Sequence, residues 1–281
     1  MVHISINEYI LIIGGDIRQK YLYYQFLNDG YHVCTYSVPG IDDTPCLDEY
    51  ISKCSAIVLP VPFSKDGITI FSTCEHKLEL KYFLSLVNPF TKIYGGYFKG
   101  DFLSKCTEKN ISLYDVKEDT TFELMNAIAT AEGAIAEAIM HSPCNLHKTQ
   151  CLVLGYGKCA HAIASRLMGL NCLVTVTARN SYQLSSAFED GCTTFPLSEL
   201  SNNICKYNFI FNTIPAPVLT RNILRKANSE VIIIDIASNP GGTDFEACKH
   251  YGLEARLCLS LPGKYAPKSS SQIIYQCIQN N

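Results

Sequence analysis

The stretch Cys151-Leu152-Val153-Leu154-Gly155-Tyr156-Gly157-Lys158-Cys159-Ala160 decides the predicted fold. Its apolar start is typical of a buried strand, and its glycines mark a sharp turn into a helix. In such a turn the first glycine permits the bend, the second lets a phosphate approach the main chain, and the final alanine lets helix and strand pack closely. A helix over 158–169 and a strand over 172–177 complete a strand–helix–strand unit. The predicted dinucleotide site begins with Gly155, Tyr156, Gly157, Lys158 and Cys159.

The residues after the second strand indicate which nicotinamide dinucleotide is bound. In NAD-binding proteins an acid at this point accepts hydrogen bonds from the ribose 2′-hydroxyl and repels a 2′-phosphate. The segment Ala178-Arg179-Asn180-Ser181 contains no acid and offers a planar guanidinium beside neutral polar groups. We therefore expect these four residues to bind the ribose phosphate of NADP. The alternative is that Arg179 is an ordinary surface residue.

Strand-like segments alternate with helical ones on both sides of the middle of the chain, which predicts parallel sheets covered by helices. Five strands are expected before residue 118, at 9–13, 31–36, 56–59, 92–97 and 111–116. Six are expected after residue 149, at 151–154, 172–177, 192–195, 208–212, 231–235 and 253–258. The fold class is therefore α/β with two doubly wound domains, the second a Rossmann-type NADP-binding domain.

The predicted organisation has an N-terminal α/β domain over 1–118, an interdomain helix and linker over 119–148, the Rossmann domain over 149–265 and a C-terminal helix over 266–281 that returns to the first domain. In the first domain Asp16 is placed to cap a helix over 17–28, on which Ile17, Tyr21 and Tyr24 share a face. In the linker helix, an apolar stripe with thin alanine-rich flanks is formed by Leu124, Ile128, Ala131, Ile135 and Ile139. Gly133 inside that helix predicts a close approach of another backbone.

Composition excludes several classes of function. The chain has 281 residues, and 23 basic against 26 acidic side chains give a net charge of −3, so no broad charge pattern favours nucleic acid or a membrane surface. The 14 cysteines and 7 histidines are scattered, without a Cys-x-x-Cys pair or zinc spacing. No signal sequence or membrane-length apolar run is evident. We expect a cytoplasmic protein with reduced thiols and no metal, and a homo-oligomer remains open.

The loops that follow parallel strands are where ligands collect. The loop Asn212-Thr213-Ile214-Pro215 is expected at the nicotinamide end of a dinucleotide, together with Ala237 from the next loop. That next loop, 235–245, carries Asp235 and Asp244, and the loop after the last strand carries Lys264, Lys268 and Ser269 as candidate anion ligands. Each has a plain structural alternative: Asn212 and Thr213 as turn residues, Asp244 as a helix cap, and the lysines as solvated cations.

The first domain and the linker helix supply further candidates. Arg18 follows the Gly14-Gly15 turn, and Ser64 and Lys65 follow Pro60-Val61-Pro62-Phe63. Glu132 is a polar residue on the thin linker helix, where a solvated acid is the alternative. Gly14-Gly15 lacks the full dinucleotide fingerprint and is expected to be a strand-to-helix turn.

The chain resembles the family of dipicolinate synthase A subunits over nearly its whole length. The resemblance rests on Ile13-Gly14-Gly15-Asp16-Ile17-Arg18-Gln19, Thr130-Ala131-Glu132-Gly133, Gly155-Tyr156-Gly157, Ala178-Arg179-Asn180-Ser181, Asn212-Thr213-Ile214-Pro215, 235–245, Leu261-Pro262-Gly263 and Ala266-Pro267-Lys268. The segment Ser238-Asn239-Pro240-Gly241-Gly242-Thr243-Asp244-Phe245 is more specific than any glycine motif.

The resemblance implies an enzyme in the mother cell of a sporulating bacterium. Together with the flavoprotein-like B subunit of dipicolinate synthase, it would oxidise dihydrodipicolinate from the lysine pathway to dipicolinate, with NADP as hydride acceptor. Because the product ring is aromatic, the protein mainly has to position two rings. Arg18, Lys264 and Lys268 are then candidates for the substrate carboxylates. Asp235, Asp244 and Glu132 are candidate bases, and water is the alternative.

Two other functions remain open at the level of sequence. The chain could hold NADP without catalysing the reaction, while the B subunit binds the substrate. It could also be a shikimate-type NADP dehydrogenase, which would require a lysine paired with an aspartate near the substrate hydroxyl, and the sequence does not identify that pair.

Overall fold

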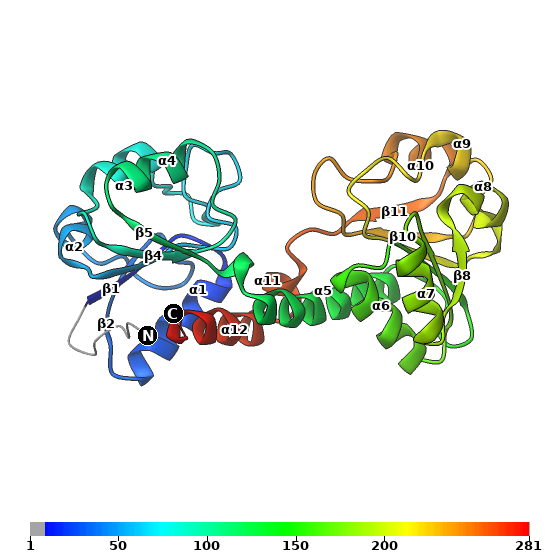
Figure 1. Cartoon of the computed structure of the whole chain (residues 1–281), viewed down its shortest axis with the longest axis horizontal. Coiled ribbons are helices and arrows are strands. Elements are labelled where there is room, and N and C mark those ends of the chain that lie inside the picture. Colours follow the sequence, from blue (N-terminus) through cyan, green and yellow to red (C-terminus); the bar gives the residue numbers. More distant parts are fainter. Residues whose placement is uncertain (1–8, 281) are drawn as a thin grey trace. The chain divides into compact units, whose positions relative to one another are not determined.

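The computed structural model describes residues 9–280 of the chain. Contacts divide them into two compact units, of which unit 2 is Asn126–Tyr265 and unit 1 combines the chain before it with the segment from Ala266 onward. Each unit has one parallel sheet with helices on its faces (Figure 1). The predicted class of two doubly wound α/β domains is confirmed.

The sheet of unit 1 has the order β2-β1-β3-β4-β5. Its strands are β1 (Tyr9–Ile13), β2 (His32–Tyr36), β3 (Ala56–Val58), β4 (Lys92–Gly95) and β5 (Ser112–Asp115). Strand β1 pairs with a strand on each side and is buried on both faces of the sheet. Its apolar run suits this central position in a parallel sheet. From β1 the chain connects to β2 on one side of the sheet, and from β2 it returns past β1 to β3 on the other side. The topological switch point of unit 1 therefore lies between β1 and β3.

Helices and short turns cover the sheet of unit 1. They are α1 (Ile17–Asn28), α2 (Leu47–Lys53), α3 (Leu80–Leu86), α4 (Asp101–Glu108), η1 (Val116–Glu118) and α12 (Pro267–Gln279). One core joins α2, α3 and α4 to the sheet through residues such as Ile51, Phe83 and Phe102. The opposite core joins α1 and α12 through residues such as Phe26 and Tyr275.

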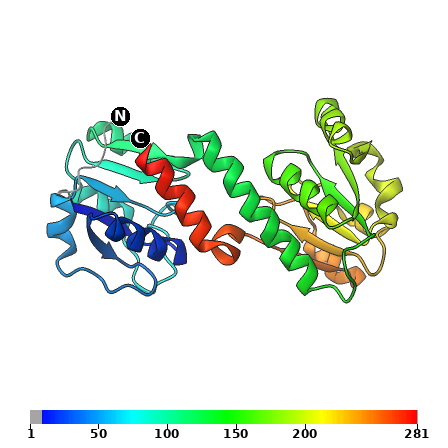
Figure 2. The same ribbon diagram turned by 90° about the horizontal axis from the view of Figure 1, so that it is seen from below.

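The last helix, α12, packs against the first, α1, although the two are at opposite ends of the chain (Figure 2). The rings of Phe26 and Tyr275 meet edge to face at 4.8 Å between centroids, and Tyr275 donates a hydrogen bond to Asp29. The C-terminal segment therefore contributes to the core of unit 1.

The sheet of unit 2 has the order β11-β10-β9-β6-β7-β8, with all neighbouring strands parallel. Its strands are β6 (Gln150–Leu154), β7 (Leu173–Ala178), β8 (Thr193–Pro196), β9 (Phe209–Asn212), β10 (Ile232–Asp235) and β11 (Glu254–Leu257). This is the order of a dinucleotide-binding sheet, whose switch point lies between β6 and β9.

The helical elements that belong wholly to unit 2 are α6 (Lys158–Gly169), α7 (Ser181–Glu189), η2 (Leu197–Glu199), α8 (Leu200–Asn203), η3 (Ile204–Lys206), α9 (Arg221–Leu224), α10 (Phe245–Tyr251) and α11 (Leu261–Tyr265). One core lies under α5, α6 and α7, and the other lies under α8, α9 and α10. Within the described residues, none of the helices combines the length and apolar character that a membrane span requires.

Helix α5 (Thr120–Met140) contributes its first residues to unit 1 and its remainder to unit 2. Its predicted apolar stripe is buried in the middle, where Ala131 and Ile135 are 0% and 7% exposed, but not at its ends, where Leu124 and Ile139 are 52% and 53% exposed. Another segment does approach Gly133 closely, but through side chains and not through the predicted backbone, since a Cβ there would lie 2.9 Å from Leu261 Cβ and from Tyr265 Cδ2. Small side chains let α11 lie directly on α5.

The predicted strands and helices are all present, with ends displaced by at most two residues. Asp16 caps α1 as predicted, with Oδ1 accepting from Arg18 N at 3.1 Å. The face of α1 that carries Tyr21 and Tyr24 is exposed, because the sheet and α12 bury the face with Leu22 and Phe26 instead.

Candidate functional site

The turn after β6 has the conformation that its glycines predict. Gly155 has φ +89°, and a Cβ there would lie 2.8 Å from Thr213 Oγ1. Gly157 is the N-cap of α6, has an extended backbone and faces open space, because no atom lies within 4 Å of a Cβ built on it. Ala160 is fully buried between α6 and the sheet. The turn therefore presents bare main chain and the N-terminus of a twelve-residue helix to whatever approaches Gly157.

Tyr156 points away from this open side of the turn. Its ring is 8% exposed, its hydroxyl donates to Asp190 Oδ2 at 2.6 Å, and His161 packs against it edge to face. Burial and the Asp190 hydrogen bond raise the pKa of Tyr156 far above its usual value. Its side chain anchors the turn to the end of α7, so Tyr156 can contribute to phosphate binding only through its main chain.

The first turn of α6 is close to α5. Lys158 is exposed and Cys159 is half-buried. Burial raises the pKa of the Cys159 thiol, and a hydrogen bond to Thr130 acts in the opposite direction. A thiol held neutral in this way is a packing residue rather than a nucleophile.

The end of β7 leaves Arg179 accessible. Ala178 is 1% exposed and ends the strand, whereas Arg179 and Ser181 are exposed. Asn180 caps α7 by accepting from Tyr182 N at 2.9 Å. Among the described residues the guanidinium of Arg179 has neither a hydrogen-bond acceptor nor a carboxylate partner, so its donors remain available for an anion.

The loop after β9 closes on itself beside the glycine turn. The buried amide of Asn212 accepts from Ile214 N at 3.1 Å and donates to Ile214 O at 3.2 Å. Thr213 donates to Leu154 O at 2.8 Å, which ties the loop to the end of β6. Pro215 is exposed beyond it. Asn212 and Thr213 therefore shape this edge of the sheet through their own turn, which is the structural role left open by the sequence.

Asp235 organises the loop after β10. The side chain is fully buried, and it accepts from Ala237 N (2.9 Å), Gly242 N (3.3 Å) and Thr243 Oγ1 (2.5 Å). A Cβ on Gly242 would clash with the Asn212 amide and the Ile214 carbonyl oxygen. Asp235 thus holds the β10 loop against the β9 loop.

The other two candidate acids also have structural partners. Asp244 caps α10 through Ala247 N at 2.8 Å. Glu132 is exposed on α5 and faces Arg166 Nε of α6 at 3.4 Å. Unlike Asp235, Glu132 is held only by this solvent-exposed ion pair.

In unit 1, Arg18 crosses from the β1 loop to the β3 loop. Nε and Nη2 donate to the two oxygens of Asp16 at 2.8 Å each, and Nη2 also donates to Val61 O at 2.6 Å. Burial by itself would raise the pKa of Asp16, but the hydrogen bonds and charge of Arg18 outweigh it and hold that pKa below its usual value. Ser64 is buried and accepts from Gly67 N at 3.0 Å, so its hydroxyl supports a turn.

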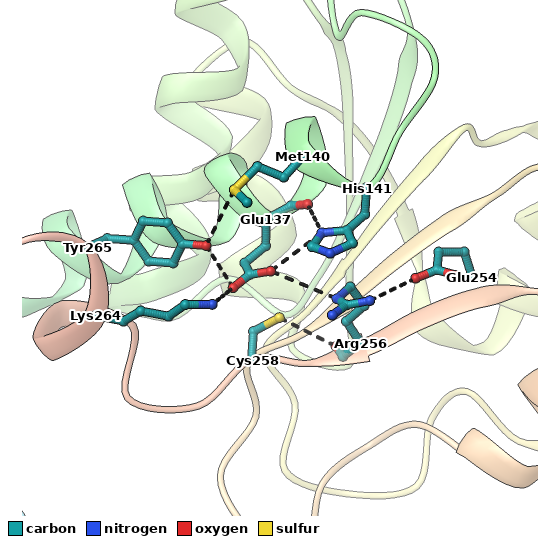
Figure 3. A network of polar contacts seen from close by, with 8 residues as sticks. All are labelled: Glu137, Met140, His141, Glu254, Arg256, Cys258, Lys264 and Tyr265. Carbon is teal, nitrogen blue, oxygen red and sulfur yellow. Dashed lines mark hydrogen bonds and ion pairs between the residues drawn. The ribbon is translucent and has the colours of Figure 1, made fainter. Parts of the chain in front are cut away.

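Lys264 belongs to a network centred on Glu137, a residue that sequence analysis did not select (Figure 3). Glu137 is a glutamate of α5 whose side chain is 5% exposed. Its Oε1 accepts from Lys264 Nζ and, at 2.7 Å, from the Tyr265 hydroxyl. Its Oε2 lies 3.5 Å from His141 Nδ1 and 3.9 Å from Arg256 Nε.

The Lys264 hydrogen bond holds the pKa of Glu137 below its usual value, with further support from Tyr265 and from the charge of His141, although burial acts in the opposite direction. The same pairing raises the pKa of Lys264. Lys264 is therefore committed to an internal carboxylate that ties α11 and β11 to α5. A signal for Glu137 exists in the sequence, since it shares the alanine face of α5 with Ala134 and Ala138.

The candidate residues fall into three groups. The glycine turn and the loops after β9 and β10 lie together at the carboxyl ends of the strands of unit 2, linked through Thr213 and Gly242. Lys264 lies in the Glu137 network. Arg18, Ser64, Lys268 and Ser269 belong to unit 1, where the last two are exposed in the first turn of α12. No group of three or more potential metal ligands occurs among the described residues.

Comparisons with known proteins match a different family model in each half of the chain and one relative over nearly its whole length. Residues 9–117 match the N-terminal domain of the dipicolinate synthase A subunit, and residues 134–250 match shikimate/quinate 5-dehydrogenase. The dipicolinate synthase A subunit of Bacillus subtilis (strain 168) is 30% identical over 280 residues, which cover 94% of this chain and 92% of the relative.

Solved structures resemble the chain over its whole length. The dipicolinate synthase A subunit from Bacillus halodurans has a TM-score of 0.86 at 27% identity and covers 97% of both chains. The corresponding protein from Bacillus subtilis has a TM-score of 0.85 at 26% identity and covers 99% of this chain and 96% of its own. The transhydrogenase from Sinorhizobium meliloti, at 12% identity and a TM-score of 0.67, shares the fold.

Proposed function

The chain belongs to the family of dipicolinate synthase A subunits, and from this premise we propose that it oxidises dihydrodipicolinate to dipicolinate with NADP as hydride acceptor. In this proposal it acts in the cytoplasm of the mother cell of a sporulating bacterium, together with the flavoprotein-like B subunit. Its substrate is a small dicarboxylate.

The open turn at Gly157 is the observation that carries the proposal. It combines bare main chain, the N-terminus of α6 and free space around the Cα atom of Gly157. These are the requirements for seating a pyrophosphate close to the backbone. The residues present therefore fit a dinucleotide, with the first turn of α6 facing its phosphates.

Arg179 supports NADP as the dinucleotide. It is exposed directly after β7, no acid follows that strand, and its guanidinium is not engaged by any described residue. A planar fork of donors suits a 2′-phosphate. The Asn180 side-chain oxygen caps α7 and is less available, which makes Arg179 the main determinant.

The chain's other residues would position the reactants. Bound NADP would supply the acceptor for the hydride that leaves the dihydropyridine ring. The loops after β9 and β10, held by Thr213 and Asp235, would form the wall beside the nicotinamide. Since Asp235 and Asp244 have structural partners, we propose that the ring proton leaves to water.

Replacement of Arg179 tests the cofactor. Arg179→Ala should raise the dissociation constant for NADP at least tenfold and leave that for NAD within about twofold, because only NADP carries the 2′-phosphate; both constants are measured by calorimetry. Arg225→Ala, at an exposed arginine after α9, is the matched control and should change neither constant. Equal losses for both dinucleotides at Arg179→Ala would contradict the assignment.

A second candidate function is favoured because candidate acids of this chain are occupied by structural hydrogen bonds. A chain in which both Asp235 and Asp244 are engaged would hold NADP while the B subunit supplies the groups that act on the substrate. Turnover of dihydrodipicolinate by the purified chain alone would reject this alternative. Turnover only after mixing with the B subunit would support it.

A further inference from the structure

The switch point of unit 1 carries a cluster of charged side chains, whereas the glycine turn at the switch point of unit 2 presents bare main chain. It lies where the loops after β1 and β3 leave the sheet in opposite directions. The first loop contains Gly14, Gly15 and Asp16, and the second contains Val61, Ser64 and Lys65. Small ligands of parallel sheets bind at this position.

Main-chain contacts exclude a phosphate site at the Gly14-Gly15 turn. Gly15 N donates to Phe71 O at 2.6 Å, Thr73 N donates to Gly15 O at 2.9 Å, and a Cβ on Gly14 would clash with the Phe71 carbonyl oxygen. The segment around Phe71 therefore occupies the space that a pyrophosphate would need. Any ligand of this switch point must be recognised by side chains.

Arg18 is not a free cation in this group. Its guanidinium donates to both oxygens of Asp16 and to Val61 O, and its side chain is 8% exposed. Through these hydrogen bonds the positive charge of Arg18 neutralises the negative charge of Asp16, and its guanidinium links the loop after β1 to the loop after β3. Arg18 therefore shapes the switch point.

Lys65 is exposed in the second loop and forms no ion pair with a carboxylate among the described residues. Its Nζ lies 3.8 Å from the centroid of the Phe71 ring, a cation–π contact that fixes the ammonium group in place. Burial lowers the pKa of Lys65, the negative charge of Asp16 opposes this effect, and the positive charges of Arg18 and Lys77 add to it. Since Asp16 and Arg18 neutralise each other, Lys65 is the cation of this group that remains without an ion-pair partner among the described residues.

The loop that carries Lys65 is held rigidly by its neighbour Asp66. Asp66 accepts from Ile68 N and Thr69 N at 2.8 Å each, and from Thr69 Oγ1 at 2.7 Å. These bonds hold the pKa of Asp66 below its usual value. The oxygens of Asp66 are directed to its own turn, and among the described residues Asp66 forms no ion pair with Lys65.

A second donor lies at the same place. Gln19 is 2% exposed and lies across the turn between Gly15 and Pro60, since a Cβ on Gly15 would clash with its Cγ and would be 3.3 Å from Pro60 Cβ. Its Nε2 has no acceptor among the described residues. A buried donor without an acceptor is unfavourable, so a ligand or water oxygen is expected nearby.

We infer that Lys65, fixed over Phe71 at the switch point of unit 1, binds one carboxylate of a small ring dicarboxylate. The inference rests on the proposed function for the identity of that dicarboxylate. It assigns substrate binding to Lys65, and it gives Arg18 and Ser64 the task of holding the two loops in position.

Calorimetric titration of the full chain with pyridine-2,6-dicarboxylate tests the inference. Lys65→Met preserves the aliphatic stem over Phe71 and removes the charge, and it should weaken binding of the dicarboxylate at least tenfold. The Tm and the dissociation constant for NADP should not change. Lys81→Met, at an exposed lysine of α3 in the same unit, is the matched control and should bind the dicarboxylate like the wild type.

Equal dicarboxylate affinity for Lys65→Met and the wild type would overturn the inference, as would absence of binding to the wild type. Added salt should weaken binding to the wild type more than to Lys65→Met, because only the wild type has the ion pair. Lys65-dependent binding without oxidation of dihydrodipicolinate, even with the B subunit present, would leave the inference in place and contradict the proposed function.

Discussion

The two units each begin the first helix of their sheet with a glycine turn, and they use it in opposite ways. In unit 1 the turn at Gly14 and Gly15 is filled by the main chain around Phe71. In unit 2 Gly155 contacts the β9 loop, whereas Gly157 faces open space. Glycine in such a turn permits a close approach without specifying what approaches. In unit 1 it is the protein's own backbone, and in unit 2 we propose that it is a pyrophosphate.

The two units also differ in where their buried charged side chains lie. In unit 1 the buried ion pair of Asp16 and Arg18 lies at the turn itself. In unit 2 the buried carboxylate with cationic partners is Glu137 of α5, and these partners lie directly after α5, on β11 and on α11. In unit 2 the N-terminus of α6 at Gly157 faces open space and so stays available for an anion.

The largest expected effect comes from filling the closed turn. Gly14→Ala should destabilise the protein by about 2–4 kcal/mol, because it adds left-handed backbone strain to a clash with the Phe71 carbonyl oxygen. Thermal unfolding followed by circular dichroism measures the loss. The matched change Gly157→Ala has neither problem and should alter stability by only about 0.5 kcal/mol or less. Similar losses at both positions would remove the distinction between the turns.

The next effect comes from filling the open turn with a larger side chain. Gly157→Val should weaken NADP binding roughly 100-fold, about 2.7 kcal/mol, because a branched side chain would occupy the approach of the phosphates. The backbone of Gly157 is extended, so valine is tolerated and the Tm should stay close to that of the wild type. Unchanged NADP affinity measured by calorimetry would show that the open space is not a phosphate site.

The smallest effect concerns the internal carboxylate of unit 2. Glu137→Gln should destabilise the protein by about 1–2 kcal/mol at pH 7, because it leaves Lys264 and Arg256 without their shared anion. The pKa of Glu137 is lowered in the folded state, so its contribution is present above the unfolded-state pKa and disappears as the pH falls through the folded-state pKa. The difference in Tm between variant and wild type should therefore stay constant from neutral pH down to about pH 4.5, the ordinary pKa of a glutamate, and shrink as the pH falls further.

Glu132→Gln is the matched control for that prediction. It lies on the same helix in an exposed ion pair with Arg166, where the loss should be about 0.5 kcal/mol or less. A loss at Glu137→Gln that is independent of pH would show that packing, not charge, accounts for its contribution.

The central strands, such as β1, β6 and β10, were predictable because each is a short apolar run between turn residues, and burial on both faces of a parallel sheet demands such runs. The helix faces were less predictable. In α5 the alanines are buried and Leu124 and Ile139 are exposed, because a close neighbour selects small side chains over large ones. A helical period identifies a face but not the element that covers it.

The glycine turn of unit 2 was predictable as local geometry, and most roles of the candidate side chains were not. Lys264 is paired with Glu137, 127 residues away in the sequence. Asp235 is occupied by the loop that follows it, and Arg18 by Asp16 and Val61. A charged residue in a loop looks the same in the sequence whether it is available to a ligand or bound to its own chain.

The sequence by itself determined the order of strands and helices, the conformation of Gly155 and the absence of an acid after β7, since these depend on residues within one short segment. Only the tertiary structure decided which glycine turn stays open and which cations stay unpaired. Both depend on segments far away in the chain, such as Phe71 folding back over Gly15 while nothing among the described residues folds back over Gly157. The physical reason is that space and charge are filled by whatever the fold brings nearby, and that is a property of the packed chain.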